Sequence, residues 1–163
     1  MEEQNVKELT ITRSFDVPVE KVWRALVDQE LVKEWWGPRG VTIPVCEIDA
    51  RKGGKISITM RAGKELGNFE GQEWPMIGEF DEVIEGKKLV FTSGAVQERE
   101  SKKMSIKSQT TMTLEEKNGK TKLVVFIKVI ESDSSPEAKF ALQGMSMGWN
   151  QQVDKLGEFL IKR

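Results

Sequence analysis

Few residues in this chain could do chemistry, because its 163-residue sequence contains no histidine and no tyrosine. Histidine zinc sites, Ser-His and Cys-His nucleophile pairs and imidazole acid–base catalysis are therefore excluded. Carboxylates, Lys, Arg, hydroxyls, amides and one cysteine, Cys46, remain. Cys46 alternates with Pro44 and Ile48 in a predicted strand and has no obvious cationic neighbour. We interpret it as a small buried residue and not as a nucleophile.

Carboxylates on predicted strands are the remaining candidates for acid–base chemistry. The polar candidates on or beside strands are Glu73, Glu79, Asp81 and Arg61. Strand alternation places Glu79 and Asp81 on one face, opposite Phe80 and Glu82, and leaves open which face is concave. A carboxylate that pointed inward would have a raised pKa and could act as a general acid or base. A solvated outer face is the commoner position.

Large apolar side chains form a second set of candidates, for binding. Trp35 and Trp36 precede Gly37-Pro38, where amphipathic rings suit a pocket mouth, although we favour core packing for at least one of them. Methionines either give adaptable walls for a flexible ligand or fill the core. The predicted ligand-binding residues are Trp35, Trp36, Met60, Trp74, Met76, Phe80, Phe91, Met112, Met145 and Trp149. No catalytic residue, metal ligand or cofactor is predicted.

Two of the predicted ligand-binding residues lie in the C-terminal part of the chain. Met145 and Trp149 lie four residues apart, with Gly148 between them and Gln152 one turn further on. Glycine inside a helix costs ~1 kcal/mol relative to alanine. Gly144 and Gly148 therefore indicate close approach of backbone or ligand, or tight helix–sheet packing.

Arg13 interrupts an apolar strand face formed by Leu9, Ile11 and Phe15. An arginine in that position either pairs with a carboxylate at the sheet end or meets an anionic ligand head. We favour the salt bridge.

Hydrophobic spacing predicts the first elements that must position these residues. Residues 9–15 alternate as a strand, and Pro18 opens a helix. Apolar residues follow at helical spacing: Val19, Val22, Trp23 and Leu26. Asp28 can cap a second short helix that runs to about Trp36 and ends at Gly37-Pro38.

The middle of the chain predicts a meander of strands. From Val41 to about Ile130, alternating apolar runs are separated by the turn signals Gly53-Gly54, Glu85-Gly86 and Asn118-Gly119. The predicted strands span residues 42–49, 56–61, 77–84, 87–93, 104–116 and 120–130. The charged stretch 97–103 has no apolar period, so we interpret it as a mobile loop or a frayed strand end.

A long helix is predicted to end the chain. Ser134-Ser135-Pro136-Glu137 combines capping hydroxyls, a proline suited to the first helical position and an early acidic residue. The apolar stripe that follows covers ~25 residues. Its members are Leu142, Met145, Trp149, Val153, Leu156 and Leu160.

These elements predict one α+β domain over residues 1–163, in which a curved antiparallel sheet wraps the long C-terminal helix. The alternating sheet has one apolar face, and the helix has one stripe to bury against it. A twisted sheet grips a cylinder imperfectly, so we expect an apolar pocket where the two diverge.

Composition limits the partners. Asp plus Glu number 26 against 25 Lys plus Arg, and the charges are interspersed, so no nucleic-acid partner is expected. No stretch approaches the ~18 apolar residues of a membrane span, and the N-terminus does not resemble a signal peptide. A lone cysteine forms no internal disulfide. We expect a cytoplasmic monomer or homodimer without membrane insertion.

Several motifs resemble one family in order and over nearly the whole chain. They are Phe15-Asp-Val-Pro-Val-Glu-Lys-Val-Trp23-Arg-Ala-Leu, Glu34-Trp-Trp36-Gly-Pro38, Arg51-Lys-Gly-Gly-Lys55 and Gly148-Trp149. The sequence resembles the activator of heat-shock-protein ATPase homologue family (AHSA-type), within the START-like, SRPBCC helix-grip superfamily. The resemblance implies a helix-grip fold with a hydrophobic cavity. The founding members are co-chaperones of the ninety-kilodalton heat-shock protein with an additional N-terminal domain, which we expect a chain of this length to lack.

Three functions are compatible with these expectations. The first is a binding protein for a small apolar or lipid-like ligand in the grip pocket. The second is a cyclase, dehydratase or hydrolase that uses a buried carboxylate. The third is a chaperone partner that acts through its surface. We rank them in that order, because the sequence contains no catalytic constellation.

Overall fold

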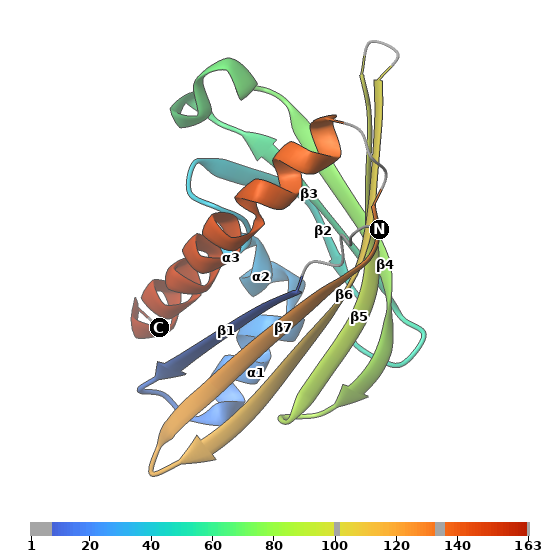
Figure 1. Cartoon of the computed structure of the whole chain (residues 1–163). Coiled ribbons are helices and arrows are strands. Elements are labelled where there is room, and N and C mark those ends of the chain that lie inside the picture. The colour runs from blue at the N-terminus through green and yellow to red at the C-terminus, as the bar shows by residue number, and fades with distance from the viewer. Residues whose placement is uncertain (1–7, 100–101, 133–135, 163) are drawn as a thin grey trace.

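The computed structural model describes residues 8–99, 102–132 and 136–162, and side chains within 8–94, 106–132 and 144–161. Seven antiparallel strands form one sheet in the order β1-β7-β6-β5-β4-β3-β2. The sheet curls around the C-terminal helix (Figure 1). The elements are β1 Glu8–Phe15, α1 Val19–Val27, α2 Gln29–Trp35, β2 Val41–Ile48, β3 Lys55–Ala62, the 3-10 helix η1 Lys64–Phe69, β4 Glu73–Ile84, β5 Lys88–Arg99, β6 Lys102–Lys117, β7 Lys120–Ser132 and α3 Pro136–Lys162.

Asp28 joins the two short helices. Its backbone N–H donates to the carbonyl of Arg24 at the end of α1, and its side chain accepts from the N–H of Glu30 at 2.9 Å to cap α2. The predicted cap is therefore confirmed. Deeper in, the indole N–H of Trp35 donates to the carbonyl oxygen of Ala25 at 2.9 Å, which fixes α2 against α1.

The core lies between the concave face of the sheet and α3. Alternate strand residues such as Ile11, Ile58 and Ile127 are buried there. The α3 stripe is confirmed from Met145 onwards, with fully buried side chains at Val153 and Leu156. The side chains of Leu142 and of the predicted capping residues Ser134 and Ser135 lie outside the described part, although Pro136 does begin the helix. Together these features form an α+β helix-grip fold.

The β6–β7 hairpin turns where its sequence predicted. Asn118 has φ 56° and Gly119 has φ 79°. A two-residue type I′ turn requires positive φ at both central positions, which Asn-Gly accepts at low cost.

Two strand predictions were wrong in extent. The charged stretch was predicted to be a mobile loop or a frayed strand end, and residues 97–99 and 102–103 belong to strands, since β5 continues to Arg99 and β6 begins at Lys102. Cross-strand backbone pairing maintains strands there without an apolar period. Likewise, β4 begins at Glu73 and not at Ile77, and η1 was not predicted.

A β-bulge in β4 corrects the predicted alternation. The register shifts between Phe80, which pairs with Phe91, and Glu82, which pairs with Val90. One extra residue reverses the facing of everything after it. Phe80 is buried in the core, whereas Asp81 and Glu82 both line the outer face.

Within the described residues, no helix is both long and apolar enough to cross a bilayer.

Candidate functional site

The loop that follows α2 is bound along α3. The Oε1 atom of Gln152 accepts the N–H of Gly37 at 3.0 Å, and Oε1 of Gln151 accepts the N–H of Arg39 at 3.0 Å. The guanidinium of Arg39 also pairs with the carboxylate of Glu158. We call residues 36–39 with their α3 partners the loop clamp.

Lys155 completes the loop clamp. Its Nζ donates to the carbonyl oxygens of Trp36 (3.2 Å), Gly37 (3.2 Å) and Pro38 (3.4 Å). Burial, and then the nearby Arg39, lower the pKa of this ammonium group. A lysine ammonium has three N–H donors, and three carbonyls engage them here. Lys155 therefore holds the loop and is not available as a nucleophile.

The loop clamp places Trp36 against α3. The rings of Trp36 and Trp149 meet edge to face, with centroids 5.7 Å apart and planes at 74°. Trp36 is 7% exposed, whereas Trp149 is only partly buried. Aromatic pairs prefer this geometry, which makes one rigid wall out of a loop and a helix.

Gly37 brings β3 into the same site. It has φ +84°, and a Cβ there would lie 2.7 Å from Cγ2 of Val41 and 3.0 Å from Sδ of Met60. Only glycine fits this contact. Met60 pairs in turn with Trp74 across β3 and β4. Trp36 and Gly37 of the loop thus link Trp149 of α3 to Met60 of the sheet.

We call the partly buried apolar side chains around this link, on α3 and on the sheet, the grip wall. On the α3 side, Met145 lies one turn before Trp149. On the sheet side, the Trp74 indole donates to Gln72 Oε1 at 3.1 Å, and its ring lies 6.2 Å from that of Phe69. Its partly buried members are Met60, Trp74, Met76, Met145 and Trp149, with Trp36 beside them.

The remaining predicted wall residues lie deeper. The residues Trp35, Phe80, Phe91 and Met112 are between 1% and 3% exposed. Phe80 and Phe91 pack edge to face with ring centroids 5.8 Å apart. We call these four buried core residues the packed floor, and Trp35 has the anchoring role favoured for one of the two adjacent tryptophans.

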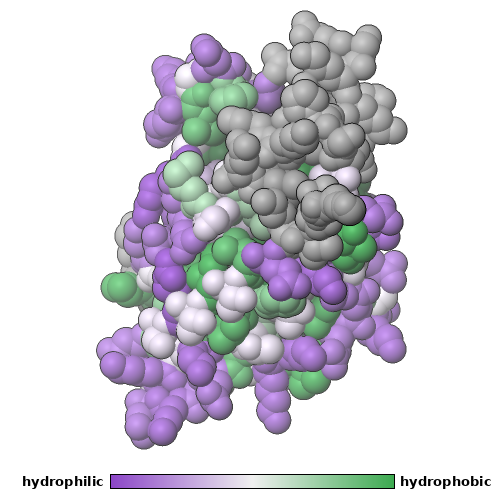
Figure 2. Space-filling model, viewed as in Figure 1, coloured by the Kyte–Doolittle hydropathy of each residue, from purple (hydrophilic) through white to green (hydrophobic). Residues whose placement is uncertain are grey.

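Apolar atoms reach the surface beside this site. In the space-filling view they form separate patches, one of them over η1 (Figure 2). Phe69 of η1 is 40% exposed. Isolated exposed apolar residues are common, so this patch alone indicates no partner.

Few polar side chains are buried in the part of the chain whose side chains are described. Among the described residues, the buried polar side chains are Ser57, Ser93, Thr110, Thr121 and Gln152. Ser93 and Thr110 stand on neighbouring strands, Thr110 opposite Phe91. This set contains no Asp or Glu. None of the buried side chains in the described part of the chain could therefore serve as the catalytic carboxylate of the cyclase, dehydratase or hydrolase considered above.

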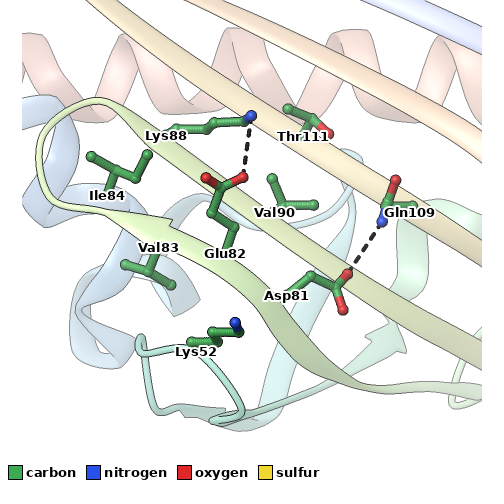
Figure 3. A pocket seen from close by; sticks show the side chains of 9 residues that line it. All are labelled: Lys52, Asp81, Glu82, Val83, Ile84, Lys88, Val90, Gln109 and Thr111. Carbon is green, nitrogen blue, oxygen red and sulfur yellow. Dashed lines mark hydrogen bonds and ion pairs between the residues drawn. The ribbon is translucent and has the colours of Figure 1, made fainter.

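The acidic candidates occupy the outer face instead. Glu73 accepts from Arg61 at 2.9 and 2.6 Å in an exposed pair. An open hollow of about 590 Å³ lies further along this face. It is lined by Lys52, Asp81, Glu82, Val83, Ile84, Lys88, Val90, Gln109 and Thr111 (Figure 3).

The two carboxylates in the outer hollow are already engaged. The Asp81 carboxylate accepts from the hydroxyl of Thr92 at 2.6 Å and from Gln109 at 3.3 Å. Glu82 pairs with Lys88 at 3.2 Å. Figure 3 shows the contacts of Asp81 with Gln109 and of Glu82 with Lys88. Exposed, paired carboxylates of this kind are poor acid–base catalysts. No group of His, Cys, Asp and Glu in the described segments is arranged to hold a metal ion.

Two further predictions concern single residues. Arg13 pairs with Asp154 at 3.2 Å and donates to Asn150 Oδ1 at 2.9 Å, so the favoured salt bridge is confirmed, with a helix carboxylate as partner. Burial raises the pKa of the Cys46 thiol to about 11. A thiol with that pKa is protonated at neutral pH, which agrees with an inert structural cysteine.

The loop clamp was not predicted from the sequence. Gln151, Lys155 and Glu158 repeat at i, i+4 and i+7 along α3, a spacing that puts them on one side of the helix. That polar stripe beside the apolar one was the available signal, but nothing local identified the loop as its partner.

Comparisons with known proteins agree with the fold. A sequence model of the family "Activator of Hsp90 ATPase homolog 1-like protein" matches residues 16–160. A solved protein from Nitrosomonas europaea is 26% identical, with 95% of this chain and 94% of that chain covered and a TM-score of 0.71. One from Chromobacterium violaceum is 24% identical, with 94% and 96% covered and a TM-score of 0.74.

A third similar structure is that of the AHSA1 protein from Silicibacter pomeroyi. It is 21% identical, with 96% of this chain and 100% of that chain covered and a TM-score of 0.72. A comparison with curated proteins finds no match. The family match covers most of the sequence and the solved structures share its architecture. The chain therefore belongs to the Activator of Hsp90 ATPase homolog 1-like protein family.

Proposed function

We propose that this protein binds a small, largely apolar molecule at the grip wall, between α3 and the sheet. The observation that carries the proposal is the contact between Trp36 and Trp149, whose ring centroids lie 5.7 Å apart. One ring is fixed by the loop clamp, and the other stands on a helix face between Met145 and Gln152. Rigid aromatic surface of this kind suits an apolar ligand.

The methionines supply the adaptable part of the site. Met60, Met76 and Met145 are partly buried and border the floor without belonging to its fully buried set. Unbranched thioether side chains change rotamer at low cost, so they can move aside for a ligand and close over it. A rigid wall beside movable methionines supports a binding function more than an acid–base one.

We also propose that the protein acts in the cytoplasm. Its cysteine, Cys46, is free and partly buried, and an apolar thiol of this kind is typical of proteins in reducing compartments.

Tryptophan fluorescence tests binding at this place. Titration with a library of aromatic and lipid-like molecules should shift the emission of the wild-type protein. The Trp149→Phe variant should lose most of that response, because the reporting ring is part of the wall. Trp23→Phe is the matched control, since Trp23 lies on α1 and should leave the response intact. A response that persists in Trp149→Phe but disappears in Trp23→Phe would place binding elsewhere.

A further inference from the structure

The amide of Gln152 has a donor without an acceptor. Gln152 is 5% exposed, and within the described structure its Nε2 is a buried side-chain atom that makes no hydrogen bond. The N–H of Gly37 donates to the other amide atom, which identifies that atom as the oxygen and leaves the NH₂ group as the donor. A buried donor without a partner is costly and uncommon in folded proteins.

This donor belongs to the loop clamp and lies next to the grip wall. Gln152 follows Trp149 by one helical turn on α3. Its oxygen is 3.0 Å from the nitrogen of Gly37, and Gly37 in turn packs against Met60. The amide therefore stands where the helix, the loop and β3 meet. A few placed polar groups in an apolar site commonly fix the orientation of a ligand.

The charge of the surroundings limits what this donor can recognise. Three cations that contact or belong to α3 are occupied: Lys155 on loop carbonyls, Arg39 on Glu158 and Arg13 on Asp154. A ligand carboxylate buried beside the amide would compete with the loop carbonyls for the three donors of Lys155, which is expensive. A neutral acceptor such as a ketone, ester or amide oxygen has no such cost.

We propose that Nε2 of Gln152 donates a hydrogen bond to a neutral carbonyl oxygen of the bound molecule. This inference rests on the proposed function and names the ligand class: an uncharged, mainly apolar molecule with one carbonyl group. The Trp36 and Trp149 rings contact its apolar body, and Gln152 selects its polar end. Specificity follows because a ligand without an acceptor leaves the donor buried and unpaired.

A matched pair of probes tests the inference. 2-Acetylnaphthalene and 2-isopropenylnaphthalene have nearly the same shape, but only the first has a carbonyl oxygen. The wild-type protein should bind the ketone more tightly, by roughly three- to ten-fold, as expected of one neutral hydrogen bond. Gln152→Met should abolish this preference.

Gln151→Met is the matched control. Gln151 also accepts a backbone N–H of the loop, but it lies on a more exposed side of α3. Both variants should therefore loosen the loop and weaken binding to a similar degree, while only Gln152→Met loses the ketone preference. A direct measurement needs no variant: the ¹⁵N-detected side-chain NH₂ signal of Gln152 should shift with the ketone and not with the alkene.

The outcomes separate the two proposals. If the wild-type protein binds both probes with equal affinity, or if the Gln152 signal ignores the ketone, the role of Gln152 is overturned and the binding function stands. If neither probe binds, the proposed function fails, and the inference fails with it.

Discussion

Nζ of Lys155 lies 3.2 Å from the carbonyl oxygen of Trp36, at the point where α2 ends and the following loop turns onto α3. This contact joins the C-terminal helix to one of the two rings of the grip wall. The wall therefore depends on a polar clamp as much as on apolar packing.

Replacement of Lys155 by methionine should loosen the clamp. The variant loses charge-assisted hydrogen bonds but also the cost of burying the ammonium, so we expect a loss of about 1 kcal/mol in the free energy of unfolding. Amide hydrogen exchange at Gly37 and Arg39 should accelerate by more than global unfolding explains. Lys33→Met is the control, because Lys33 makes only an exposed pair with Glu30 and should leave the loop protected. Unchanged exchange at both amides in Lys155→Met would contradict the clamp.

Gly37→Ala should be markedly destabilising. A non-glycine residue at φ +84° costs about 1–2 kcal/mol, and the added Cβ would also meet Val41 at 2.7 Å. Gly86→Ala is the matched control, since Gly86 has φ +74° and open space around its missing Cβ. Urea denaturation of the two variants should show a larger loss at Gly37, and the difference measures the contact with Val41 and Met60. Equal losses would mean that the loop does not press on β3.

Trp35→Phe should lower the stability of the protein but leave its response to ligand intact, because Trp35 belongs to the packed floor and not to the grip wall. Trp35 is 1% exposed, and its indole N–H donates to Ala25. Loss of that bond and of ring volume should cost about 1–3 kcal/mol in stability. The fluorescence response to ligand should remain, because Trp36 and Trp149 are intact. A variant of normal stability that no longer responds to ligand would instead make Trp35 part of the wall.

Cys46 should react slowly with alkylating agents. Because the pKa of its thiol is about 11 in the folded protein, the rate of labelling by iodoacetamide should rise with pH towards a midpoint near that value. In urea the midpoint should fall towards the ordinary thiol pKa. The folded state holds the proton more tightly, so the stability contributed by the protonated thiol is present below the ordinary pKa and is lost as pH rises through about 11. Cys46→Ala should lack this dependence, and rapid labelling of the native protein at pH 7 would rule out burial.

The elements of this fold could be predicted because each has a local signal. Asp28 caps a helix, Asn118-Gly119 forms a turn, and Pro136 begins α3, and all three depend on residues next to them in sequence. Alternation predicted which strand residues share a face, except where the bulge at Asp81 reversed it, and left open which face is concave. A bulge leaves no hydrophobic signature when the residues around it are charged.

The site was less predictable because its contacts are remote. Gln152 and Gly37 are 115 residues apart, and neither residue type predicts a hydrogen bond to the other. The predicted ligand-binding residues were chosen as large apolar side chains, and the sequence could not divide them between the packed floor and the grip wall. That division depends on which of them α3 and the loop cover, as Trp35 and Trp36 show despite being adjacent.

Native mass spectrometry of the protein purified gently from its own host tests the central claim most directly. The account predicts a one-to-one complex with an uncharged, carbonyl-bearing apolar molecule that is released on denaturation. The complex should be absent from Trp149→Ala protein and retained by Trp23→Phe protein. An unliganded wild-type protein that also fails to acquire any molecule from the aromatic and lipid-like library would contradict the binding function.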